Sequence, residues 1–179
     1  MRRLSDRQHL GVQDGGVVDQ SVSTPAVAYL MEVGVPFLQL TYEHSSEFDH
    51  GFGVEAAQKL GFDPAEVFKT LLVDTDGEIV CVVVPVDHRM SLKKVARAAG
   101  AKKAQMLPPE VAQRRTGYVV GGISPFGQKQ QAPVIIDQSC LNQDSIVVSG
   151  GRRGFSLRLD VLDFVEAAKA LVEDVIAAS

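Results

Sequence analysis

The sequence predicts an α+β fold, built as a single domain around a mixed β-sheet. Segments typical of strands and helices follow one another without the regular strand–helix alternation of a parallel α/β fold. Segment 78–86 is apolar on both faces, which is typical of a strand in the middle of a sheet. The sequence shows no repeats and no internal linker, and its 179 residues suffice for one hydrophobic core.

The first 22 residues differ in character from the rest. Residues 1–22 are polar and contain Gly and Gln, so we expect a disordered leader followed by a folded domain over 23–179. The first helix is expected to begin at Thr24-Pro25, where an N-cap residue precedes a proline, and to end at Gly34.

The remaining elements follow from periodicity and turn residues. Strands over 67–73 and 78–86 are joined at Asp76-Gly77, a dipeptide typical of hairpin turns. Segment 161–175 has apolar residues at helical spacing and is predicted to be one amphipathic helix. The other expected elements are a strand over 36–42, helices over 54–60, 92–99 and 110–115, and strands over 104–107, 118–120, 133–137, 145–148 and 155–159.

Composition excludes several classes of protein. Hydrophobic residues make up 45% and charged residues 22% of the chain, as in ordinary soluble domains. Cys81 and Cys140 stand alone in apolar segments and the histidines lack ligand spacing, so neither a metal site nor a cofactor is expected. No secretory signal or bilayer-length apolar run is visible, which predicts a cytoplasmic protein that does not bind membranes.

Positive charge is concentrated in the middle of the chain. Residues 91–158 carry 11 Lys and Arg against 3 Asp and Glu, although the net charge of the whole chain is −4. These cations either gather on one face that binds a polyanion or are spread over a mixed, solvated surface.

The segment 119–128, VVGGISPFGQ, is a candidate ligand-binding loop. Gly121, Gly122 and Gly127 surround Ser124 and Pro125. Glycine permits positive φ and close approach of a ligand, while proline restricts the turn. The pattern predicts a rigid loop whose N–H groups can bind a carbonyl or an oxyanion. The alternative is a tight turn that is rich in glycine for steric reasons alone.

Lys69 lies in an otherwise apolar strand, VFKTLLV. Strand alternation puts Lys69 on the face opposite to Thr70. A desolvated ammonium needs an anion, a carbonyl or a water-filled pocket, so we expect the lysine and the glycine-rich loop to face one pocket. The alternative is a lysine whose stem lies along apolar surface while its ammonium reaches water.

Known catalytic motifs do not fit the loop. Gln128 stands where a Walker A loop requires lysine, and Pro125 directly follows Ser124, which excludes a nucleophile elbow. A Ser124–Lys69 pair of nucleophile and base stays open.

Two further pairs of residues are candidates for the pocket. Arg152 and Arg153 lie in a second glycine-rich turn and suit phosphate contacts, unless they belong to a loose hairpin with solvated arginines. Tyr42 and Phe52 flank a polar loop and either wall a pocket or belong to the core.

From Thr24 to about Val172 the chain resembles the YbaK family of aminoacyl-tRNA deacylases, which is related to the editing domain inserted in bacterial prolyl-tRNA synthetases. The matching segments occur in order: TPAVAYL, VFKTLLV, LKKVARAAGAKKAQM, TGYVVGGISPFGQK and VSGGRRG. The resemblance implies a mixed-sheet, barrel-like core flanked by helices. It also implies hydrolysis of the ester that joins a wrong amino acid to tRNA.

The resemblance also implies roles for individual residues. Lys69 and Gly121 would be catalytic, with Lys69 engaging the substrate near the scissile ester. Gly121 and Pro125 would end a GxxxP loop whose backbone holds the terminal adenosine and the aminoacyl carbonyl. The cysteine thiol of the substrate would attack the ester, so no protein nucleophile is required. The residues implied to bind substrate are Tyr42, Phe52, Thr70, Gly122, Ile123, Ser124, Pro125, Ser149 and Gly150.

The predicted function is therefore editing in trans of mischarged tRNA(Pro), above all Cys-tRNA(Pro), with prolyl-tRNA synthetase as an implied partner. Three alternatives stay open: deacylation of Ala-tRNA(Pro), a non-catalytic module that binds tRNA 3′ ends or nucleotides, and an amidase that uses Ser124 and Lys69.

Overall fold

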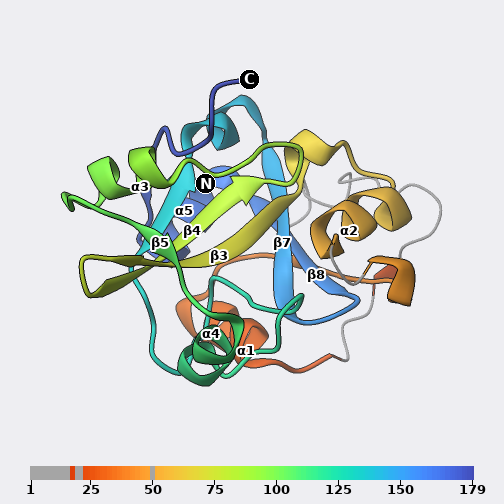
Figure 1. Cartoon of the computed structure of the whole chain (residues 1–179). Helices are drawn as coiled ribbons and strands as arrows, with labels where there is room; N and C mark the ends of the chain where they lie inside the picture. The colour runs from red at the N-terminus through yellow and green to blue at the C-terminus, as the bar shows by residue number, and fades with distance from the viewer. Residues whose placement is uncertain (1–16, 19–21, 49–50) are drawn as a thin grey trace.

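The computed structural model describes residues 17–18, 22–48 and 51–179, which form two β-sheets flanked by helices (Figure 1). One sheet is antiparallel with strand order β1-β2-β8-β7, and the other is mixed with order β5-β3-β4-β6-β9. The strands are β1 (Val17–Val18), β2 (Leu38–Thr41), β3 (Phe68–Thr75), β4 (Glu78–Pro85), β5 (Gln105–Met106), β6 (Val134–Asp137), β7 (Ser145–Arg152), β8 (Phe155–Asp160) and β9 (Leu171–Glu173). The predicted α+β class with a mixed sheet is confirmed.

The helices begin and end at residues suited to those positions. The Thr24 hydroxyl accepts a hydrogen bond from the Val27 N–H at 3.2 Å, and Gly34 ends the first helix at a φ of 73°, as predicted. The α-helices are α1 (Pro25–Val33), α2 (Phe52–Leu60), α3 (Leu92–Ala98), α4 (Pro109–Thr116) and α5 (Val161–Ala168), and the short 3-10 helices are η2 (Ser46–Phe48), η3 (Pro64–Glu66) and η4 (Gln138–Asn142).

The β3–β4 hairpin forms the centre of the mixed sheet. Asp76 and Gly77 both have positive φ, 55° and 95°, as a two-residue hairpin turn of type I′ requires. β4 lies between β3 and β6, and pairs with β6 in parallel from Cys81 to Val83. The prediction that this strand is central is confirmed.

The two sheets meet where β3 passes β7. Val67, directly before β3, forms a parallel bridge with Val147 of β7, whereas β5 pairs with β3 only at Val73 and Asp74. Between these two points, the edge of β3 that faces away from β4 has no strand partner in the described chain. Such an edge offers its main-chain groups to whatever lies beside it.

A core of large apolar side chains fills the space between the sheets. Phe126, at the end of the glycine-rich loop, is almost fully buried and packs edge-on against Phe164 of α5, with ring centroids 5.2 Å apart. Its ring also stacks on Tyr29 of α1 at 5.9 Å. The loop is therefore anchored in the core at this end.

Two predicted elements are wrong. The last segment is not one helix, because α5 ends at Ala168 and Lys169 adopts a left-handed conformation with a φ of 50°. Residues Leu171–Glu173 then pair in parallel with β6, so the open edge of that strand decides their structure. Residues 118–120 do not form a strand, because the Val119 carbonyl accepts a hydrogen bond from the Gly122 N–H at 2.9 Å and turns the chain.

The N-terminal prediction falls mostly outside the described residues. Within the segment expected to be a leader, Val17–Val18 pairs with Leu40 and Thr41 of β2. In the part of the chain that the structure describes, no helix combines the length and the apolar character needed to cross a bilayer.

Candidate functional site

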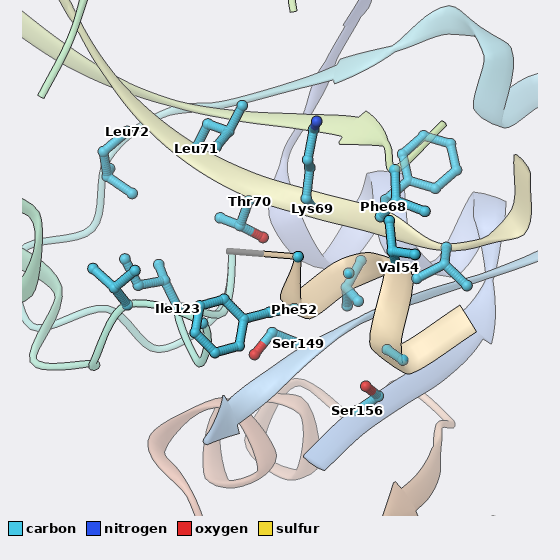
Figure 2. A pocket seen from close by; sticks show the side chains of 18 of the residues that line it. Phe52, Val54, Phe68, Lys69, Thr70, Leu71, Leu72, Ile123, Ser149 and Ser156 are labelled. Atoms are coloured by element: carbon cyan, nitrogen blue, oxygen red, sulfur yellow. The ribbon is translucent and has the colours of Figure 1, made fainter. Parts of the chain in front are cut away.

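A cavity of about 450 Å³ lies along the open edge of β3. The start of α2, the glycine-rich loop and strands β7 and β8 close it on the other sides (Figure 2). Its walls are mainly apolar, with a few hydroxyl groups and one amine. The lining residues are 51–54, 56, 67–72, 106, 107, 109, 112, 120, 121, 123, 148, 149, 155 and 156, together with Tyr42 and Val86.

Thr70 provides the hydroxyl that faces the interior of this cavity. Figure 2 shows its side chain on the side of β3 where Phe52, Ile123 and Ser149 lie. The Thr70 Oγ1 atom is buried and has no hydrogen-bond partner among the described residues. A buried hydroxyl without a partner is costly, so this atom is suited to bind a polar group of a ligand.

Lys69 directly precedes Thr70 on β3 and is also one of the residues that line the cavity. Its side chain extends from the face of the strand opposite to Thr70, as strand alternation predicts (Figure 2). Burial and the nearby Arg89 guanidinium lower the pKa of the Lys69 ammonium, while the Asp87 carboxylate opposes them. The ammonium is therefore easier to deprotonate than that of an ordinary lysine.

The glycine-rich loop supplies main-chain donors. Gly121, at a φ of 85°, is the third residue of the turn from Val119 to Gly122, a position that favours glycine. A side chain at 121 would also come within 2.6 Å of the Phe52 ring. The Gly122 N–H is used by the turn, whereas those of Gly121 and Ile123 have no partner within the described chain.

Ser124 supports the loop from behind. It is fully buried, its hydroxyl accepts a hydrogen bond from the Phe126 N–H at 3.2 Å, and its carbonyl accepts one from Gln128 Nε2 at 3.0 Å. Ser124 does not line the cavity, and this arrangement gives a Ser124–Lys69 catalytic pair no support.

The structure separates the predicted site residues into two groups. Seven of them line the cavity: Lys69, Gly121, Tyr42, Phe52, Thr70, Ile123 and Ser149. The other four lie outside the lining, where they shape the loops: Gly122, Ser124, Pro125 and Gly150. Pro125, for example, accepts a hydrogen bond from Gln131 through its carbonyl at 3.1 Å, and the Gly150 carbonyl accepts one from the Thr24 hydroxyl at 2.6 Å.

Phe52 is held in place by a contact that the sequence does not reveal. The guanidinium of Arg153 lies 4.9 Å from the centre of the Phe52 ring, and its Nε donates a hydrogen bond to the Val120 carbonyl at 2.8 Å. The His44 ring also lies near Phe52, with ring centroids 5.3 Å apart. Arg153 thus connects the first turn of α2 with the glycine-rich loop.

A buried carboxylate lies one turn further along α2. Glu55 is fully buried, with Oε1 2.7 Å from His44 Nδ1, Oε2 accepting from the Ser45 N–H at 2.9 Å, and Lys59 Nζ at 3.4 Å. Burial opposes ionisation, but the bonds from His44, Ser45 and Lys59 outweigh it and hold the pKa of Glu55 below its usual range. This network fastens the loop before α2 beside the cavity.

The titratable groups of the lining are few. Besides Lys69 there is Tyr42, whose pKa is raised to about 12 by burial and by the Glu55 charge. Among the described residues that line the cavity, none is a His, Cys, Asp or Glu. Within the described residues, no three such side chains come together as a metal site would require. The cavity can bind and polarise a ligand, but the described lining carries no conventional nucleophile with its base.

The family model of the aminoacyl-tRNA editing domain matches residues 53–167, which contain most of these elements. The chain is 34% identical over 138 residues to the "Putative Cys-tRNA(Pro)/Cys-tRNA(Cys) deacylase EbsC" of Enterococcus faecalis, covering 76% of this chain and 82% of that protein. It is also 34% identical over 87 residues to a proline–tRNA ligase of Acidithiobacillus ferrooxidans, covering 49% of this chain and 15% of the ligase. Among solved structures, hypothetical protein APE2540 matches with a TM-score of 0.77 at 26% identity, covering 86% of this chain and 100% of that one.

Proposed function

The chain belongs to the family of aminoacyl-tRNA editing domains, and from that premise we propose that it deacylates mischarged tRNA(Pro) in trans. The preferred substrate is Cys-tRNA(Pro), and the bond broken is the ester between the amino acid and the terminal adenosine. The relative named as a Cys-tRNA(Pro) deacylase and the match to part of a proline–tRNA ligase support this choice of substrate.

One observation carries the proposal: three hydrogen-bond donors without partners in the described chain belong to residues that line the same cavity. They are the hydroxyl of Thr70 and the N–H groups of Gly121 and Ile123. An aminoacyl ester brings a carbonyl and a ribose hydroxyl that need such donors. The volume of about 450 Å³ lies within the range of roughly 300–1,000 Å³ typical of small-ligand sites.

The chemistry assigned to these groups is stabilisation of negative charge. Attack on the ester carbonyl puts charge on its oxygen, and fixed N–H groups in a site with little water stabilise that charge by several kcal/mol. Gly121 takes this role in catalysis. Lys69, with its long and flexible side chain, favours the same charge or orients the ribose hydroxyls from the edge of the cavity. Tyr42, Phe52, Ile123 and Ser149 bound the space for the aminoacyl group.

The nucleophile is assigned to the substrate itself. The cysteine sulfur of Cys-tRNA(Pro) attacks its own ester carbonyl, a carbon–sulfur bond forms as the bond to the ribose oxygen breaks, and the thiol proton passes to that oxygen. The cyclic thioester that is released then reacts with water to give free cysteine. This assignment agrees with a described lining that has no His, Cys, Asp or Glu. It also requires neither a metal nor a cofactor.

The substrate determines the partners. We place the reaction in the cytoplasm, where charged tRNA is used, and infer that prolyl-tRNA synthetase works beside this protein. The partner supplies selectivity for tRNA(Pro) that a cavity for the 3′ end does not.

The direct test is deacylation of Cys-, Ala- and Pro-tRNA(Pro) by the purified protein. We expect the fastest release from Cys-tRNA(Pro). Lys69→Ala is expected to lower kcat by about 10²-fold or more without changing the unfolding midpoint. The control Lys94→Ala removes a partly buried lysine that lies outside the cavity and pairs with Asp174, and it should retain full activity.

Each rival function predicts a different result. Faster release of alanine than of cysteine supports the Ala-tRNA(Pro) alternative. Binding of charged tRNA without any deacylation identifies a non-catalytic module. Loss of activity in Ser124→Ala, without loss of the fold, supports the amidase. Undiminished turnover by Lys69→Ala contradicts the role given to that residue.

A further inference from the structure

A second hollow, which we call the basic groove, lies beside the β3–β4 turn and α3. Its lining includes four cations, Lys93, Arg97, Lys102 and Lys103, and two carboxylates, Asp74 and Asp76. All four cationic residues are exposed. They come from the central part of the chain in which the sequence concentrates positive charge, so some of these cations do gather on one surface.

The two carboxylates of the basic groove serve the backbone rather than the cations. Asp74 accepts a hydrogen bond from the Gly77 N–H at 2.7 Å, and Asp76 accepts one from the Lys102 N–H at 2.7 Å. Among the described residues, no ion pair involves Lys93, Arg97 or the side chains of the other two cations.

Lys94, the neighbour of Lys93 on α3, shows the contrast. Its Nζ lies 2.9 Å from Asp174 Oδ2, and it is not part of the groove lining. The same helix therefore carries one lysine that is paired within the protein and another that is available to an external anion.

Strand β5 connects the basic groove with the cavity. Ala104 and Gln105 line the groove, whereas Met106 and Leu107 line the cavity. β5 lies beside β3 and pairs with it (Figure 1). These residues therefore follow the same edge of β3 whose residues 67–72 line the cavity. Lys103 and Met106 are three positions apart along the extended chain, or about 10 Å at roughly 3.3 Å per residue.

We propose that the basic groove binds the phosphodiester backbone of the tRNA acceptor arm while the aminoacylated 3′ end occupies the cavity. The proposal rests on the proposed function. Phosphates are the ligand that several unpaired lysines and arginines favour, and the short path along β5 fits a few nucleotides between the bound end and the first contacted phosphates. An acidic protein surface could also bind these cations, but such a ligand would not account for the short connection between the groove and the cavity along β5.

The experiment compares the double variant Lys102→Ala/Lys103→Ala, the single variant Lys93→Ala and the control Lys94→Ala on two substrates. One is full-length Cys-tRNA(Pro), and the other is the cysteinyl ester of adenosine, which lacks the acceptor arm. On tRNA we expect kcat/KM of the double variant to fall roughly tenfold at low salt, and the slope of log(kcat/KM) against log[salt] to become shallower by about 1 to 2. On the adenosine ester the double variant should equal the wild type.

The outcomes separate this proposal from the proposed function. Wild-type protein that hydrolyses neither substrate refutes the proposed function. Wild-type protein that hydrolyses both, with groove variants that behave like Lys94→Ala on tRNA, refutes the basic groove alone. An equal loss on both substrates also refutes it, because the damage then lies in the cavity. A loss that occurs only when prolyl-tRNA synthetase is present assigns the groove to a protein partner and overturns the RNA proposal.

Discussion

Lys69 is the residue whose electrostatics are most open to a direct test. Its pKa is lowered by burial and by Arg89, and Asp87 acts in the opposite direction. If the ammonium is the active form, kcat/KM falls as the pH rises through the pKa of Lys69, below the pH at which an ordinary lysine would lose its proton.

Two charge-removing variants should move the alkaline limb of the pH profile, where kcat/KM falls, in opposite directions. Arg89→Gln removes a repelling cation, so the pKa of Lys69 rises and activity persists to higher pH. Asp87→Asn removes an attracting anion, so the pKa falls and activity is lost at lower pH. The measurement is kcat/KM on Cys-tRNA(Pro) against pH, corrected for spontaneous ester hydrolysis. Limbs that coincide in all three proteins would show that the profile reports another group, such as the substrate thiol.

At the scale of single residues, the sequence shows which chemical groups belong to the site better than it shows where their side chains point. Strand alternation places Lys69 and Thr70 on opposite faces of β3, and Figure 2 shows them so. Alternation does not say which face adjoins the ligand space, and Thr70 is the one that points toward Phe52 and Ile123. Glu55 is buried in α2 together with two alanines. A glutamate next to two alanines in a short predicted helix is the one sequence feature that could have indicated a buried carboxylate network.

At the scale of elements, Arg153 determines how α2 and the glycine-rich loop are held relative to each other. Arg153→Ala removes both the stacking on Phe52 and the hydrogen bond to the Val120 carbonyl. The loop should then open more often, because a main-chain contact and a cation–π contact of about 1 kcal/mol are lost together.

Hydrogen exchange measures this loosening. We expect faster amide exchange over residues 119–124 and a lower kcat in Arg153→Ala, and only part of the effect in Arg153→Lys, which keeps the charge but not the planar group. Arg152→Ala is the matched control for exchange, since the Arg152 guanidinium lies 5.9 Å from the Phe155 ring instead. Unchanged exchange in Arg153→Ala would show that the loop is held by its own turn and by Phe126.

Elements were predictable where local signals agree with the final structure. The hairpin at Asp76-Gly77 is one case, because both residues tolerate the positive φ that the turn requires. The C-terminal segment is the opposite case. Leu171 and Val172 continue the helical spacing of α5, yet they pair with Ile135 and Ile136 of β6. A partner that distant in the sequence leaves no local signal, so periodicity alone gave the wrong element.

At the scale of the molecule, the site depends on where the two sheets meet. The open edge of β3 exists because β7 bridges the chain at Val67 and β5 pairs only from Val73 onward. Neither position is marked in the sequence. The residue types of the cavity could therefore be predicted from the loop and the lysine strand, but the edge along which they assemble could not.

The C-terminal tail extends this dependence to the far end of the chain. Val175 is fully buried, its N–H donates to Asp137 Oδ1 at 3.0 Å, and its carbonyl accepts from the Ser91 N–H at 2.8 Å. Two residues later, the Ala177 N–H donates to the Arg89 carbonyl at 2.7 Å. The tail thus fastens the segment that carries the charges beside Lys69.

Val175→Ala should lower the free energy of unfolding by about 2 kcal/mol, because buried methyl groups are lost and a small cavity remains. Asp174→Asn, which breaks only the exposed pair with Lys94, should change it by less than about 0.5 kcal/mol. Urea denaturation of the three proteins measures both values. The pH profile of kcat/KM tests a second role of the tail. If the tail also holds Arg89 near Lys69, the alkaline limb of this profile in Val175→Ala moves toward that of Arg89→Gln. A destabilised variant with an unmoved limb would confine the tail to a role in stability, and equal stability of all three proteins would place it outside the cooperative core.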